Sequence, residues 1–147
     1  MRRRSVAGLA VMTVFIGIQF IPVNRSNPPV HGEIQAPRAV SEVLQRSCYD
    51  CHSNETEWPW YSHVAPVSWV LVHHVDEGRE EFNFSTWSEL AEKDRSEIIH
   101  EIWEETSEGK MPLRSYLVIH PEAKLSEADI ETLRKWSGSS KQESGSD

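Results

Sequence analysis

Cys48-Tyr49-Asp50-Cys51-His52 places two thiols three residues apart, with an imidazole directly after the second thiol. The chain has 147 residues and only these two cysteines, which excludes a scaffold built on several disulfides. The two thiols therefore close one small loop, carry out redox chemistry, or hold a ligand. The sequence on either side of the motif helps to choose between these uses.

The residues around the motif have helical periodicity. Apolar positions recur three and four residues apart in four stretches, and no stretch has the period-two pattern of a strand. These stretches begin at Pro37, at Pro66, near Asp94 and after Ser126. Their expected buried faces are, in chain order, Val40, Val43, Leu44, Ser47, Cys48 and Cys51; Val67, Val70, Leu71, His74 and Val75; Ile98, Ile99, Ile102 and Trp103; Ile130, Leu133 and Trp136. We predict an all-α domain in which both thiols share one helix face and Gly78 ends the second helix.

Four uses of the Cys-x-x-Cys-His motif compete. A redox pair belongs at the start of a helix after a strand, whereas this pair ends a helix that no strand precedes. A structural zinc ion needs further ligands at short spacing, and no second cysteine pair exists. A local disulfide suits an exported protein. Covalent attachment of haem gives every residue a role, because two thiols add to the two vinyl groups and the imidazole of His52 reaches the iron. We favour haem attachment, and the other three uses stay open.

Beyond this motif, the sequence resembles class I cytochrome c, which has a helix ending in Cys-x-x-Cys-His, a Met-Pro pair in a late loop and a final helix that starts Leu-Ser-x-x-Asp. More narrowly, residues 38–136 resemble the small bacterial haem-binding-domain family. The motifs that carry this resemblance are Cys51-His52-Ser53-Asn54, Trp58-Pro59-Trp60-Tyr61-Ser62, Ala65-Pro66-Val67-Ser68-Trp69, Gly78-Arg79 and Asn83-Phe84-Ser85-x-Trp87. The resemblance implies a cytochrome c-like domain of about four helices around one covalent haem c, assembled by the cytochrome c maturation machinery. In that pattern, Arg79, Trp69 and Asn83 are candidates to hydrogen-bond a haem propionate.

The ligand on the second side of the iron decides which chemistry is open to such a protein. Met111 is the first candidate, because Gly109 ends the third helix and Pro112 fixes an extended loop that can present a thioether. Cys48, Cys51, His52 and Met111 are therefore the predicted cofactor-binding residues, with His52 and Met111 as the iron ligands. Histidines are the alternative ligands, and His74, on the apolar side of the second helix, is the best of them. The other available histidines are His63, His73, His100 and His120.

The first 23 residues have the pattern of a membrane anchor or a secretion signal. Three arginines follow Met1, and an apolar run extends from Val6 to Val23. Because the run ends without the small residues that signal peptidase needs, we favour an uncleaved single span over a cleaved signal. The arginines predict that the N-terminus stays in the cytoplasm, with the domain on the periplasmic side of the inner membrane.

Composition and charge set the remaining boundaries. Residues 24–37 are rich in proline and read as an extracytoplasmic tether, residues 38–136 form the domain, and the Ser/Gly-rich residues 137–147 read as a disordered tail.

Residues 31–147 hold 11 of the 15 basic side chains and all 23 acidic ones. Such an acidic body repels phosphate backbones, which excludes nucleic acid as a partner and favours a redox partner with a basic face.

Two classes of function fit these features. An electron carrier has two strong axial ligands and no open position at its iron, and this is the function we expect. A haem-based sensor or a peroxide-active haem protein needs a labile or open second side, usually with a positioned base and a cation nearby. In the sequence near Met111, the only candidates for such a base and cation are His120 and Arg114, which are not adjacent. We therefore expect an electron carrier rather than an enzyme.

Overall fold

The computed structural model describes the backbone of residues 2–144, and its side chains from residue 6 to residue 138. Within residues 2–144 the chain forms seven α-helices, three short 3-10 helices and no β-strand. The α-helices are α1 (Arg2–Ile18), α2 (Arg38–Ser47), α3 (Tyr49–His52), α4 (Val67–Glu81), α5 (Glu92–Ser107), α6 (Arg114–Leu117) and α7 (Glu127–Ser144). The 3-10 helices are η1 (Trp60–His63), η2 (Trp87–Glu89) and η3 (Pro121–Ala123). The all-α prediction is confirmed for this part of the chain.

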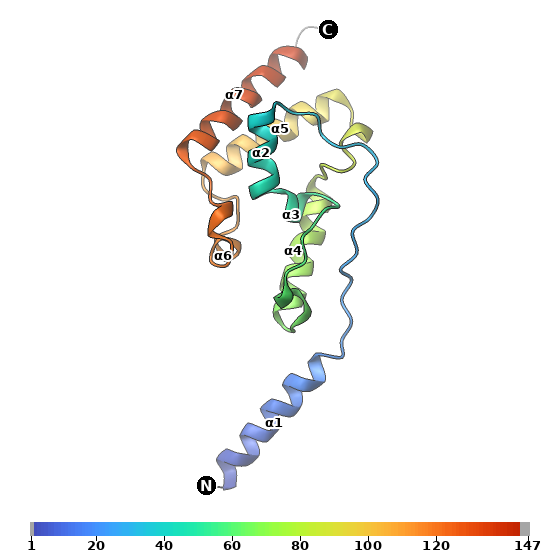
Figure 1. Cartoon of the computed structure of the whole chain (residues 1–147), viewed down its shortest axis with the longest axis vertical. Helices are drawn as coiled ribbons and strands as arrows, with labels where there is room; N and C mark the ends of the chain where they lie inside the picture. Colours follow the sequence, from blue (N-terminus) through green and yellow to red (C-terminus); the bar gives the residue numbers. More distant parts are fainter. Residues whose placement is uncertain (1, 145–147) are drawn as a thin grey trace.

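The core lies where α2 crosses the pair formed by α5 and α7 (Figure 1). Leu44 of α2, Leu133 of α7 and Phe84 of the loop after α4 are completely buried there. Ile99 and Ile102 of α5 pack into the same cluster. Each such side chain contributes about 1.5–3 kcal/mol on burial. This core holds α2, α5 and α7 together. The residues of the candidate site lie instead on and around α3, α4 and α6.

The predicted first helix is confirmed as far as Ser47 and then differs from the prediction. Cys48 leaves helical geometry, with φ −129° and ψ −33°, and α3 begins as a separate short turn. The N–H groups of Cys51 and His52 both point back to the carbonyl of Cys48, at 3.2 and 3.0 Å. Cys48 therefore lies at the break itself and Cys51 lies in the turn after it, so the two thiols do not share one continuous helix face.

The second helix differs from the prediction in its end and in its buried face. α4 runs through Gly78 and ends at Glu81. The predicted face included Val67 and Val70, yet these two side chains are 45% and 54% exposed. The residues of α4 that are buried are Ser68, Val72, Val75 and Gly78. Periodicity finds an apolar stripe on a helix, but it does not say whether the chain itself covers that stripe.

The two later long helices follow their predicted signals. Gly109 follows the end of α5 and has φ +68°, the left-handed conformation that commonly terminates a helix. At the start of α7, Asp129 accepts hydrogen bonds from the backbone and hydroxyl of Ser126, and its own N–H donates to the Ser126 hydroxyl. α7 continues to Ser144, past residue 137 where the tail is predicted to begin, and Ser137 is buried. Residues 145–147 of the predicted tail lie outside the described residues.

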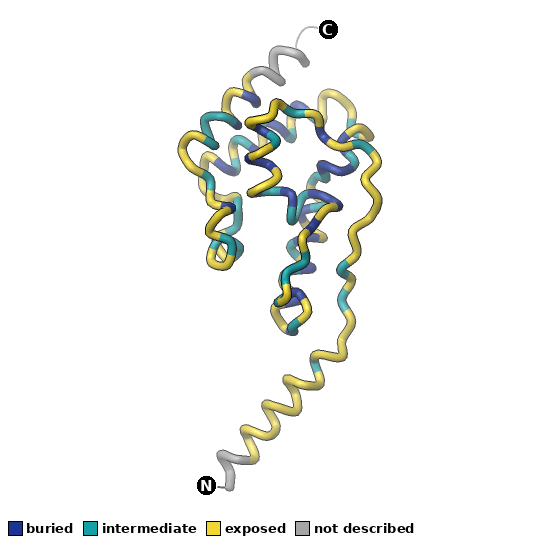
Figure 2. The backbone as a smooth tube through the Cα atoms, viewed as in Figure 1, coloured by how far each residue is buried: buried dark blue, intermediate teal, exposed yellow. Residues whose placement is uncertain are grey.

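α1 stands apart from the domain, and its described residues are exposed except for Ile18 at its end, which is partly buried (Figure 2). Leu9, Val11 and Met12 are each more than half exposed, and Phe15 is 48% exposed. None of the helices found in residues 2–144 combines the length and apolar character that crossing a bilayer requires. The membrane anchor predicted for residues 1–23 therefore stays a prediction.

Residues 24–36, here called the strap, run extended along the side of the domain (Figure 1). The backbone N–H groups of His31 and Gly32 donate to the carbonyl of Ser85, and that of Ile34 donates to Phe84. Gly32 passes so close to Ser88 that a Cβ atom would lie 1.7 Å from the Ser88 hydroxyl. The segment predicted as a tether is thus attached to the domain over much of its length.

Candidate haem site

The two cysteines are free thiols that the fold shields from water. Cys48 and Cys51 are partly buried and not bonded to each other. Burial raises the pKa of Cys48 to about 12 and that of Cys51 to about 11, in the first case with help from the neighbouring thiol and in the second from Asp50. Both sulfur atoms are therefore protonated near neutral pH, and the local disulfide considered from the sequence does not form in this structure.

Gly78 brings α4 directly against α3. A Cβ atom at this position would lie 2.7 Å from the carbonyl oxygen of Cys51 and 3.1 Å from its Cβ. Any larger side chain would have to push the two helices apart. The glycine that was expected to end α4 instead fixes the distance between this helix and the motif.

His52 is held by an aromatic ring and lacks a hydrogen-bond partner on one side. Its imidazole stacks on Phe82, with ring centroids 4.1 Å apart and planes 12° from parallel. Nδ1 is buried and makes no hydrogen bond. Burial lowers the pKa of His52, although backbone groups of Phe82 and Gly78 act against this effect. The ring is thus kept neutral, which is the form that binds a metal ion.

The chain after His52 is fastened by Arg79, whose guanidinium makes four hydrogen bonds. Nε donates to the carbonyl of Ser53 at 2.8 Å, and Nη2 donates to the hydroxyl of Thr56 at 2.9 Å. The same group reaches the strap, at the carbonyl of Ser26 and the side-chain oxygen of Asn27. One side chain of α4 therefore holds the loop after the motif and the strap together.

A small hollow opens beside Cys51. Its walls include Leu71 and Val75 of α4, and Tyr116 and His120 from the segment around α6. The hollow has a volume of about 10 Å³, which is the room of about one water molecule. A ring as large as a porphyrin needs the segment 114–120 to lie farther from Cys51 than it does here.

Two side-chain hydrogen bonds join that segment to the motif side of the hollow. The hydroxyl of Tyr116 donates to a carboxylate oxygen of Asp50 at 2.6 Å. His120 is paired with the hydroxyl of Tyr61 through Nε2 and with Glu122 through Nδ1. Sequence reasoning did not place Tyr116 in the site, because helical periodicity carries no information about a contact between residues 66 positions apart in the chain.

The structure gathers three of the four predicted cofactor residues. Cys48, Cys51 and His52 lie within two adjoining helical turns, whereas Met111 lies in the loop between α5 and α6, 36% exposed and outside the residues that line the hollow. His74 is half-buried on α4. The position of Met111 does not test whether it binds iron, so its role stays a prediction.

The three candidate propionate partners differ in how far they are already engaged. Arg79 is occupied by the four contacts above, and Asn83 donates to the side chain of Asn54 and accepts from the N–H of Ser85. The indole N–H of Trp69 is buried and has no partner. Among these three side chains, the indole nitrogen of Trp69 is therefore the donor atom that makes no hydrogen bond.

The donor set fits haem of the c type better than the alternatives. Two unpaired thiols flank a neutral, buried imidazole whose Nδ1 is unsatisfied. Among the described residues no group of three or more His, Cys, Asp or Glu side chains gathers to hold a metal ion, which leaves a zinc site without support. No strand precedes the motif within residues 2–144, as a thioredoxin-like redox pair requires.

Comparison with known proteins supports haem as the ligand. A family model described as a haem-binding domain matches residues 13–139, which includes the strap as well as the helical domain. No curated protein and no solved structure is similar enough to count as a match. Because the family model covers most of the chain, the protein belongs to the haem-binding domain family.

Proposed function

We propose that this protein is a membrane-anchored c-type cytochrome that carries single electrons on one covalently attached haem. The observation that carries the proposal is the pair of free thiols beside a buried imidazole with an unpartnered Nδ1. Each S–H group would add across one vinyl group, so that sulfur bonds to one carbon and the hydrogen to the other. Bound in this way, the haem would supply one-electron chemistry at its iron.

The residues around His52 would set the properties of that site. The stack on Phe82 fixes the plane of the imidazole, and burial keeps the ring neutral and available as a ligand. Leu71 and Val75 offer an apolar wall beside Cys51, and the free indole N–H of Trp69 offers a donor to a propionate. The chain thus brings attachment, orientation and an apolar surface to one face of the cofactor.

Covalent attachment is tested by denaturing electrophoresis with haem staining, on protein produced together with a cytochrome c assembly system. We expect colour to travel with the wild-type polypeptide and to be lost when Cys48 and Cys51 are both changed to Ala. His63→Ala is a suitable control, since His63 is an exposed histidine outside the motif. Colour that acid acetone extracts from the wild type would contradict the proposal.

Met111 is the proposed ligand on the second side of the iron. Its loop is fastened by the N–H groups of Lys110 and Met111, which both donate to the carbonyl of Glu105. We expect Met111→Ala to remove the weak long-wavelength absorption of sulfur-to-iron charge transfer, to lower the reduction potential and to speed the binding of carbon monoxide. Val118→Ala, at another exposed apolar position near α6, should change none of these. An unchanged spectrum in Met111→Ala would point to a histidine, with His74 the first to test.

The polar wall of the hollow supports a second candidate, a haem-based sensor or a peroxide-active protein. His120 lies there with a carboxylate, Glu122, on its other nitrogen, which is the pairing that orients a general base. Fast carbon monoxide binding by the wild-type ferrous protein, or peroxide turnover well above that of free haem, would favour this candidate over the electron carrier.

The location and partners follow from the N-terminal segment and the charge. We infer a single span with the three arginines in the cytoplasm and the domain on the periplasmic side of the inner membrane, supported by the apolar surface that α1 exposes on all sides. The acidic body favours a redox partner with a basic face, and the attachment chemistry requires the cytochrome c maturation machinery.

A further inference from the structure

The domain has one surface whose composition differs from the rest. Residues 58–75 contain no Asp, Glu, Lys or Arg, although residues 31–147 hold 34 such side chains. Within this stretch, Trp60 is 79% exposed, and Val67 and Val70 are 45% and 54% exposed. A large aromatic ring and two branched aliphatic side chains thus face outward from an acidic domain.

The second uncharged stretch of the chain meets this surface. Residues 5–24 also lack charged side chains, and they include α1 from Ser5 to its end at Ile18. At the end of α1, the side-chain amide of Gln19 donates to the carbonyl of Ala65 at 3.1 Å and accepts from the N–H of Ala65 at 3.0 Å. Phe20 and Ile21, which follow, are 83% and 53% exposed. The two uncharged stretches are therefore joined by a paired hydrogen bond.

We propose that this surface, the apolar tip formed by Phe20, Ile21, Trp60, Val67 and Val70, rests in the headgroup region of the bilayer that holds α1. The inference rests on the proposed anchoring of α1. Tryptophan is favoured at that depth because its ring is apolar and its N–H is polar.

The length of α1 supports contact between the apolar tip and the membrane. Its 17 residues span about 25 Å as a helix, which is less than the roughly 30 Å of a bilayer's hydrocarbon core. The end of such a helix lies at or below the headgroup level. Since Gln19 ties that end to Ala65, the neighbouring tip cannot stand far from the membrane.

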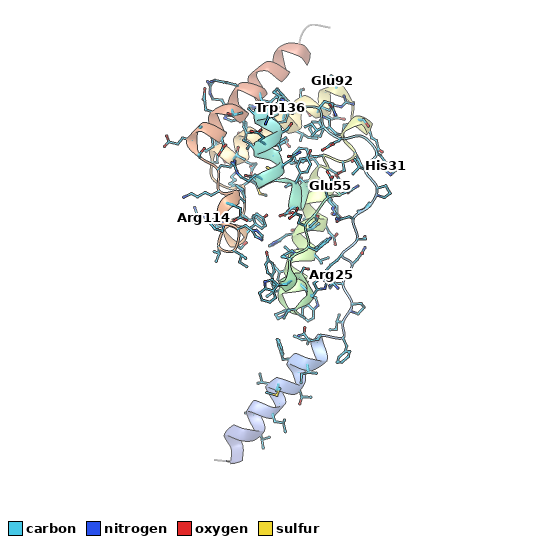
Figure 3. The ribbon with its side chains drawn as sticks, viewed as in Figure 1. Arg25, His31, Glu55, Glu92, Arg114 and Trp136 are labelled. Carbon is cyan, nitrogen blue, oxygen red and sulfur yellow. The ribbon has the colours of Figure 1, made fainter. Side chains whose placement is uncertain are left out.

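Charge favours the same orientation. An acidic surface is repelled by anionic headgroups, so the uncharged tip is the part of the domain that meets least opposition. Arg25, a cation that anionic headgroups attract, donates to the carbonyl of Ser62 at the base of the tip. Figure 3 shows Arg25 near the end of the domain that faces α1, and Trp136 at the opposite end.

The tryptophans give a direct test, since all six lie in the domain and none in α1. The full chain is labelled with 5-fluorotryptophan and placed in nanodiscs of phosphatidylethanolamine and phosphatidylglycerol, with or without lipid that carries a nitroxide near its headgroup. Each fluorine resonance is assigned by a Trp→Phe variant. We expect the nitroxide lipid to broaden the resonance of Trp60 and to leave that of Trp136 sharp.

A matched pair of variants tests which surface is in contact. Val70→Glu should reduce the broadening of Trp60, whereas Val30→Glu, at a 46% exposed valine in the strap, should leave it unchanged. Equal broadening of Trp60 and Trp136, or equal effects of the two variants, would overturn the apolar tip as a membrane contact. If the tip instead binds a protein, the nitroxide lipid would broaden the resonances of Trp60 and Trp136 equally.

The outcome is separable from that of the proposed function. A chain that does not stay with the nanodiscs would contradict both the anchor and the tip. A chain that stays with the nanodiscs but carries no covalent haem would contradict the cytochrome proposal alone. The effect of the nitroxide lipid on the Trp60 resonance can be measured with or without bound haem.

Discussion

Cys48 and Cys51 hold their protons more tightly than ordinary thiols, because burial raises the pKa of the first to about 12 and of the second to about 11. In an unfolded chain both thiols titrate near 9. A protonated thiol therefore favours the folded state, and this contribution is complete below about pH 9 and lost as the pH rises toward 12.

We expect the free energy of unfolding of the chain with free thiols to fall in this alkaline range. The fall should be several kcal/mol greater than in the Cys48→Ala/Cys51→Ala variant, because each unit by which a pKa is raised corresponds to about 1.4 kcal/mol. Urea denaturation at a series of pH values measures both proteins. Comparison with the double variant removes the contribution of Tyr49 and Tyr116, whose pKa values are also raised by burial. Parallel curves for the two proteins would show that the thiols do not titrate in this way.

At the level of single residues, the sequence identifies the motif but not its surroundings. Cys48, Cys51 and His52 are predicted from their spacing, which is a local property. The stack of His52 on Phe82 and the bond from Tyr116 to Asp50 join residues far apart in the chain. Such contacts depend on how the helices pack, so spacing within one segment cannot predict them.

Among the elements, the contact between α3 and α4 depends on the absence of a side chain at Gly78. In an exposed helix interior, Gly→Ala stabilises by about 0.5–1 kcal/mol. At Gly78 the added methyl group meets the backbone of Cys51 at 2.7 Å, so we expect a net loss of about 1–3 kcal/mol. Gly138→Ala in α7, where a Cβ would meet nothing within 4 Å, should be neutral or stabilising. Thermal unfolding of both variants decides this, and equal shifts would contradict the close packing.

The helices themselves are predictable to different degrees. α5 and α7 follow from their periodicity and end signals, as Gly109 and the Ser126–Asp129 pair show. α4 is predicted as a helix, but its buried face is not, because its apolar stripe is only partly covered by the chain. The break at Cys48 has no signal in the apolar pattern. Periodicity therefore predicts that a helix is present more reliably than it predicts which element the helix packs against.

For the molecule as a whole, the strap should resist proteolysis despite its extended backbone. Its bonds to Arg79, Ser85 and Phe84 hold it against the domain. On protein taken out of the bilayer with detergent, we expect a protease of broad specificity to cut first within residues 20–23, before it cuts within residues 26–36. Arg79→Met should speed cleavage within residues 26–36, whereas Arg38→Met, at a side chain that is 93% exposed, should not. Mass spectrometry of the first fragments identifies the sites, and early wild-type cleavage within 26–36 would refute this attachment.

The attachment of the strap also limits where the protein can meet other molecules. A free linker of 13 residues would let the domain range about 45 Å from its anchor. Fastened along the domain, the same residues add almost nothing to its reach. The anchored cytochrome proposed above would search for its partners in two dimensions, and it would exchange electrons only with molecules that come to the membrane surface.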